Sequence, residues 1–68
     1  MKTVSGKDLC KLLEKKGWVL KKINGSHHIY TKKDRIERIS IPVHGNKDMK
    51  TGLLKSIMKI VGLEEEDL

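Results

Sequence analysis

The sequence predicts a small two-layer α+β domain in which a helix, three antiparallel strands and a second helix follow in that order. Apolar residues recur at helical spacing near both ends of the chain, whereas the middle is rich in β-branched and aromatic residues between short polar turns. A chain of 68 residues buries only a modest core. We therefore expect one domain over residues 1–68, with its functional site on the surface.

The first helix is expected over about residues 5–16. Ser5 is a good N-cap, and Asp8 three positions later places a carboxylate in the first turn, close to the capping-box pattern. Gly17 follows two lysines and can adopt the left-handed conformation that ends many helices. These residues define where the helix starts and stops.

Three strands are expected over about residues 18–24, 28–32 and 36–43, joined as an antiparallel meander by short connections. The pair Asn24-Gly25 is typical of a tight hairpin turn between the first two. The third segment shows the clearest alternation of apolar and polar residues. The first mixes apolar side chains and lysines on both of its alternating faces.

The second helix is expected over about residues 50–61, where six apolar residues recur at helical spacing before Gly62. This density of apolar positions predicts a well-buried helix that lies across the sheet. An acidic tail follows over residues 64–68.

The charge balance favours nucleic acid as a partner. The chain has 15 Lys and Arg against 9 Asp and Glu, and four of the nine acids lie in the tail, so the rest of the domain is strongly basic. A merely solvated lysine surface is the plainer alternative. With one Trp, one Tyr and no Phe, recognition of backbone or shape is favoured over base stacking. The lysines expected to bind RNA are Lys21, Lys22, Lys32 and Lys33.

The single cysteine, Cys10, excludes an internal disulfide and is expected to be a packing residue of the first helix rather than a nucleophile. No apolar run approaches the roughly 20 residues that a membrane-spanning helix needs, and no signal peptide is recognised. We expect a cytoplasmic protein with no membrane partner.

Gly25-Ser26-His27-His28 is the stretch with the most chemistry, because histidine exchanges protons near neutral pH. Adjacent residues of a strand point to opposite faces, so His27 and His28 would not readily hold one metal ion together, even with His44. No second cysteine or cluster of carboxylates supplies further ligands, and we expect neither a metal nor a cofactor. A serine-hydrolase triad lacks an acid placed to orient the base.

Acid–base chemistry on RNA needs less. RNA carries its own nucleophile, the 2′-hydroxyl, so one histidine could take that proton or protonate the leaving 5′-oxygen while lysines stabilise the phosphate. Ser26 and the amides of the turn could hold a phosphate oxygen. A histidine that merely packs or lies on the surface is the alternative.

Four motifs, in this order, resemble the HicA family. They are a helix that ends in Lys16-Gly17-Trp18, the turn Gly25-Ser26-His27, the segment Ile41-Pro42-Val43-His44-Gly45 and a closing helix over Leu53–Leu63. Each motif alone is weak, but the four together at these spacings are fairly specific, and the similarity covers nearly the whole chain.

The resemblance implies a double-stranded-RNA-binding-domain-like fold and a toxin that cleaves mRNA independently of the ribosome and is neutralised by a HicB antitoxin. It also implies that the catalytic histidine is the one after Gly-Ser, His27. Gly25, Ser26 and His28 are possible supporting residues. His44 is then a family-pattern position that is structural rather than catalytic. Two alternatives stay open: a non-catalytic double-stranded-RNA-binding module, or an inactive family member that only binds its antitoxin.

Overall fold

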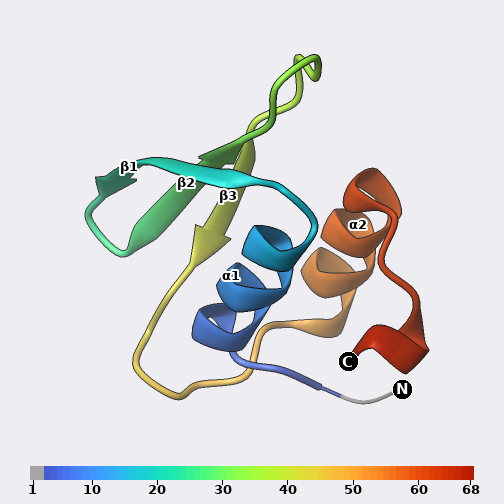
Figure 1. The fold of residues 1–68 in the computed structure, drawn as a ribbon. Coiled ribbons are helices and arrows are strands. Elements are labelled where there is room, and N and C mark those ends of the chain that lie inside the picture. The colour runs from blue at the N-terminus through green and yellow to red at the C-terminus, as the bar shows by residue number, and fades with distance from the viewer. Residues whose placement is uncertain (1–2) are drawn as a thin grey trace.

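The computed structural model of the protein describes residues 3–68 (Figure 1). The chain forms a helix, three antiparallel strands and a helix in the predicted order, which confirms the fold class. A short 3-10 helix, η1, follows in the acidic tail. The elements are α1 (Gly6–Lys15), β1 (Val19–Asn24), β2 (His27–Thr31), β3 (Ile39–Pro42), α2 (Thr51–Val61) and η1 (Glu65–Asp67).

The sheet has the strand order β1-β2-β3, and both helices lie on one side of it (Figure 1). On this inner face Tyr30, Ile39 and Ile41 are buried and form one core with residues of both helices. The opposite, outer face carries no helix (Figure 1). A side chain that points outward from β2 therefore has an open approach.

Helix α1 begins as its sequence predicts. The Ser5 hydroxyl accepts a hydrogen bond from the backbone amide of Asp8 at 3.2 Å, which satisfies one of the free amides of the first turn. Gly6 follows, and a Cβ at this position would collide with the carbonyl oxygen of Pro42. Glycine thus lets the start of α1 lie directly against the end of β3.

β1 contains a β-bulge at Lys21. Leu20 pairs with Tyr30, and Lys22, two residues later, pairs with Ile29, the immediate neighbour of Tyr30. The extra residue shifts the alternation of the rest of the strand, so Lys22 pairs on the outer face and Ile23 on the inner face. This explains why the sequence of β1 shows no clean period of two.

The starts of β2 and β3 differ from those expected, and the other strand ends agree to within one residue. β2 begins at His27 rather than residue 28, because the turn consists of Gly25 and Ser26 and Asn24 already pairs with His27. β3 begins only at Ile39, not at residue 36. Ile36 is 97% exposed in the loop between β2 and β3, which projects from the sheet (Figure 1). A β-branched residue there has no partner strand, so its strand propensity is not realised.

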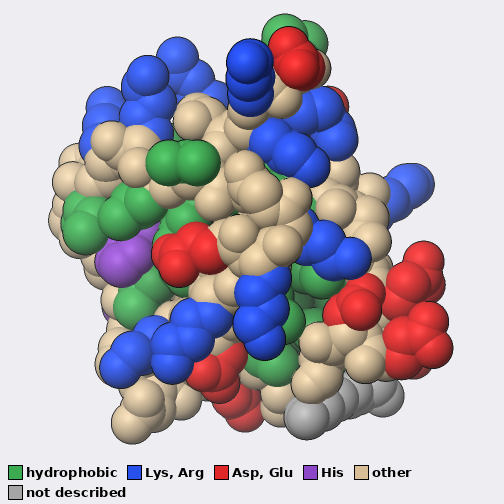
Figure 2. Space-filling view, viewed as in Figure 1, with side chains coloured by type: hydrophobic (Ala, Val, Ile, Leu, Met, Phe, Trp, Pro, Cys, Tyr) green, Lys and Arg blue, Asp and Glu red, His purple; other side chains and the backbone are tan. Residues whose placement is uncertain are grey.

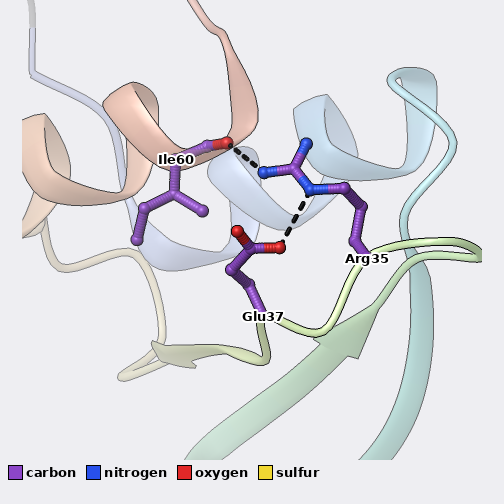
Figure 3. Close-up of polar contacts among 3 residues, drawn as sticks. All are labelled: Arg35, Glu37 and Ile60. Carbon is purple, nitrogen blue, oxygen red and sulfur yellow. Dashed lines mark hydrogen bonds and ion pairs between the residues drawn. The ribbon is translucent and has the colours of Figure 1, made fainter.

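Arg35 holds the base of this loop in place (Figure 3). Its Nε donates to Glu37 Oε1 at 2.9 Å, and its Nη2 donates to the carbonyl oxygen of Ile60 in the last turn of α2 at 3.1 Å. The guanidinium also lies 5.7 Å from the ring centroid of the buried Trp18. The hydrogen bond from Arg35 lowers the pKa of the Glu37 carboxyl. These contacts join the loop to α2.

Helix α2 begins one residue later than expected, because Lys50 is its N-cap, and Gly62 ends it in the left-handed conformation with φ 77°. Leu54, Ile57 and Met58 are buried, but Leu53 and Ile60 are each 40% exposed, so the helix is less buried than its apolar content predicts. It lies next to α1 on the covered side of the sheet (Figure 1). None of the helices within residues 3–68 is long and apolar enough to cross a membrane.

Candidate functional site

His27 is the first residue of β2 and its side chain is exposed. It pairs with Asn24 of β1 and with Pro42 of β3. Paired residues share a face of a sheet, and Tyr30 and Ile39 form a pair on the buried inner face. Because side chains alternate along a strand, His27, three positions before Tyr30, points to the opposite face. His27 therefore projects from the open outer face, where a large substrate can reach its imidazole.

His28 lies on the opposite face. It is half-buried, pairs with the fully buried Ile41, and its Nδ1 lies 4.0 Å from the Sγ of Cys10 in α1. A substrate on the outer face cannot contact both adjacent histidines at once. The structure thus separates the two histidines that the sequence places side by side.

Cys10 and Tyr30, which line the inner face together with His28, are buried and protonated. Burial raises the pKa of the Cys10 thiol, so it stays a thiol rather than a nucleophilic thiolate at neutral pH. The Tyr30 hydroxyl donates a 2.6 Å hydrogen bond to Glu14 Oε2, and burial together with this bond raises the pKa of Tyr30. This inner-face cluster has the properties of a packed, hydrogen-bonded core.

The turn before His27 is open and anchored. Gly25 has φ 63°, a conformation that suits glycine in a two-residue hairpin, and no atom lies within 4 Å of where its Cβ would be. The carbonyl oxygen of Ser26 accepts a 2.7 Å hydrogen bond from the amide of Val43. This bond fixes the turn against the segment that follows β3.

The four lysines expected to bind RNA lie in two places. Lys22 pairs with Ile29 on the outer face, and Lys21 is exposed at the bulge beside it. Lys32 and Lys33 follow the far end of β2, about 17–20 Å from His27 at 3.3 Å per residue. Only the first pair lies near the histidine. Figure 2 shows further Lys and Arg side chains over β1 and the projecting loop, and acidic side chains near the C-terminal segment.

Two lysines outside that set follow β3, whose last residue pairs with His27. Lys47 and Lys50 line a groove that begins at Pro42, the cross-strand partner of His27, and also includes His44. Lysine spacing alone gave no signal for them. The strand order of the meander does indicate them, since it pairs the start of β2 with the end of β3, and the segment that contains both lysines follows Pro42.

Comparisons with known proteins agree on one family. The sequence pattern described as "HicA toxin of bacterial toxin-antitoxin" matches residues 6–63. A solved structure described as "HicA3 and HicB3 toxin-antitoxin complex" contains a chain with 32% sequence identity and a TM-score of 0.68; the alignment covers 87% of this chain and 94% of that one. A comparison with curated protein sequences gives no significant match. The pattern match spans most of the chain, and the chain therefore belongs to the HicA toxin family of bacterial toxin–antitoxin systems.

Proposed function

We propose that this chain is an endoribonuclease that cleaves mRNA without a metal ion and uses His27 as general acid or base. The observation that carries the proposal is the position of His27, exposed on the open face of the sheet between a glycine turn and the end of β3. A general acid or base must reach the proton that it transfers, and a surface strand allows this for a polymer too large for a pocket.

In the proposed step the ribose 2′-oxygen loses its proton and attacks the adjacent phosphorus. The bond from phosphorus to the 5′-oxygen breaks, and that oxygen leaves with a proton. The products are a 2′,3′-cyclic phosphate and a 5′-hydroxyl, and no water or external oxidant enters. His27 accepts the first proton or donates the second. Gly25 and Ser26 lie next to His27 in the turn, where the Ser26 hydroxyl and turn amides can hold a phosphate oxygen.

We also propose that a HicB-like antitoxin restrains this activity by covering His27. The solved relative is described as a complex of HicA3 with HicB3, which supports a partner of that kind. The lysines of β1 that attract RNA also attract an acidic protein surface. Both mRNA and such a partner would be encountered in the cytoplasm.

The direct test is incubation of the purified protein with a defined mRNA in EDTA. We expect cleavage to persist in the chelator, with fragments that end in a cyclic phosphate, because the 2′-hydroxyl and a histidine suffice for the reaction. Fragments with 5′-phosphates, or cleavage that EDTA abolishes and Mg²⁺ restores, would contradict the mechanism. Intact RNA bound tightly by the protein would instead favour the non-catalytic RNA-binding alternative.

The basic residues predict a strong dependence on salt. Each lysine that neutralises a phosphate of single-stranded RNA contributes about 0.7 to the slope of log affinity against log salt concentration, because counterions are released. We expect Lys21→Ala and Lys22→Ala to flatten this slope when measured by fluorescence anisotropy on a His27→Ala background. Lys32→Ala and Lys33→Ala test whether the RNA extends to the far end of β2. A slope near zero for the parent protein would refute binding through the basic surface.

A further inference from the structure

We infer that the groove after β3, lined by Pro42, His44, Lys47, Lys50 and Leu53, is a nucleotide subsite that holds the residue of RNA next to the scissile phosphate. The inference rests on the proposed ribonuclease function and adds to it where the substrate lies. The groove has a volume of about 320 Å³, which is enough to accept part of one nucleotide.

One lining residue of the groove is the cross-strand neighbour of His27. Pro42 pairs with His27 across the sheet, and cross-strand partners have their Cα atoms about 5 Å apart. The amide of Val43, the residue after Pro42, donates a 2.7 Å hydrogen bond to the Ser26 carbonyl oxygen. This bond fixes the chain at the start of the groove to the turn that precedes His27. A strand of RNA whose scissile phosphate lies at His27 therefore has this groove directly beside it.

The lining combines positive charge, which binds a phosphate, with apolar surface, on which a ribose or base packs. Lys47 and Lys50 are exposed cations at the rim, and neither takes part in an ion pair among the described residues. Pro42, the buried Met49 and the 40% exposed Leu53 form an apolar floor against which a ribose or a base can pack. His44, exposed at the entrance, adds a hydrogen-bonding group.

One acidic group also lines the groove. Asp48 Oδ2 accepts a 3.1 Å hydrogen bond from the Thr3 hydroxyl, and its residue also forms a β-bridge with Ser5. The carboxylate is thus engaged with the N-terminal segment, while two lysines remain to face an incoming phosphate. This charge balance favours an anionic occupant. Because Pro42 of the lining pairs with His27, RNA, the proposed substrate, is favoured over a separate acidic peptide.

The chain offers a matched control for the lysines. Lys55 and Lys59 are exposed residues of α2, like the groove lysines in charge, but they line a different groove with Gly62 and Glu65. The double variants Lys47→Ala/Lys50→Ala and Lys55→Ala/Lys59→Ala each remove two positive charges. Any difference between them reports position rather than net charge.

The experiment measures binding of a fluorescein-labelled ten-nucleotide RNA by each double variant on a His27→Ala background, so that the RNA stays intact. We expect the groove variant to lose at least about tenfold in affinity and to reduce the salt slope by about 1.4, the value for two lost phosphate contacts. The control variant should lose less than about twofold. Equal losses in both variants would overturn the subsite.

A second measurement tests the apolar floor on the active protein. Leu53 and Ile60 are both 40% exposed on α2, but only Leu53 lines the groove. Sequencing of cleavage products should show that Leu53→Gln changes the base frequencies at a position adjacent to the cut, whereas Ile60→Gln does not. Unchanged frequencies in both variants would mean that no base or ribose packs on Leu53. If the parent cleaves no RNA, the ribonuclease proposal fails while the binding measurement still tests the groove.

Discussion

The variant His27→Ala is expected to lose about 10²–10⁴-fold in the rate of RNA cleavage, the usual contribution of a general acid or base. Its affinity for RNA should change far less, since lysines provide most of the binding free energy through phosphate contacts. Because His27 is exposed and forms no part of the buried core, the fold should keep its thermal stability. Single-turnover cleavage, anisotropy and thermal unfolding measure the three quantities on one preparation.

His28→Ala is the matched control, since it removes the neighbouring imidazole from the same strand. His28 packs on the inner face beside Cys10, so its loss should lower the free energy of unfolding by about 0.5–3 kcal/mol and leave the chemical step nearly intact. The opposite pattern, in which His27→Ala cleaves at the parental rate and a folded His28→Ala does not, would show that the wrong histidine was assigned.

Saturating antitoxin is expected to abolish cleavage, and co-expression of the partner should restore the growth that the toxin alone arrests. The physical reason is occlusion: His27 lies on an open sheet face that one protein surface can cover. Charge complementarity should make association fast and sensitive to salt. A competition assay that measures RNA cleavage against increasing concentrations of partner checks this result.

A pair of charge reversals locates the contact. Lys22→Glu, on the outer face near His27, should slow association with the partner by about tenfold or more, since reversing a charge within an interface opposes electrostatic steering. Lys59→Glu, on α2 and away from that face, should leave the rate within about twofold. If the complex forms but cleavage continues unchanged, inhibition by occlusion is refuted.

Much of the fold could be predicted from the sequence because its signals are local. The cap at Ser5, the stop at Gly17 and the helical spacing before Gly62 each act over a few residues, and the structure confirms all three. The strand boundaries were less predictable. Ile36 has a high propensity for strands, but its backbone follows Arg35, whose side chain is held by contacts from Trp18 and Ile60 that lie far away in the sequence.

The candidate site, like the fold, has a part that local sequence signals predict and a part that they do not. Gly25, Ser26 and His27 are neighbours in sequence, so a local motif could identify them. The opposite orientation of His27 and His28 follows from strand alternation, but which of the two points outward depends on the register of β2 with Ile41 and Pro42. The groove lysines could not be assigned, because the groove depends on the pairing of Pro42 with His27 and on the path of the loop after β3.

The bulge at Lys21 also bears on how copies of the protein meet one another. β1 is an edge strand of the sheet. An edge strand can pair with a second copy of the protein through its free amides and carbonyls, which is the first step toward aggregation. The extra residue interrupts the regular spacing of these groups, and it places a lysine charge at the interruption. A like charge on an approaching copy would oppose pairing there. One inserted residue therefore places Lys22 on the outer face and makes β1 a poor template for intermolecular sheet growth.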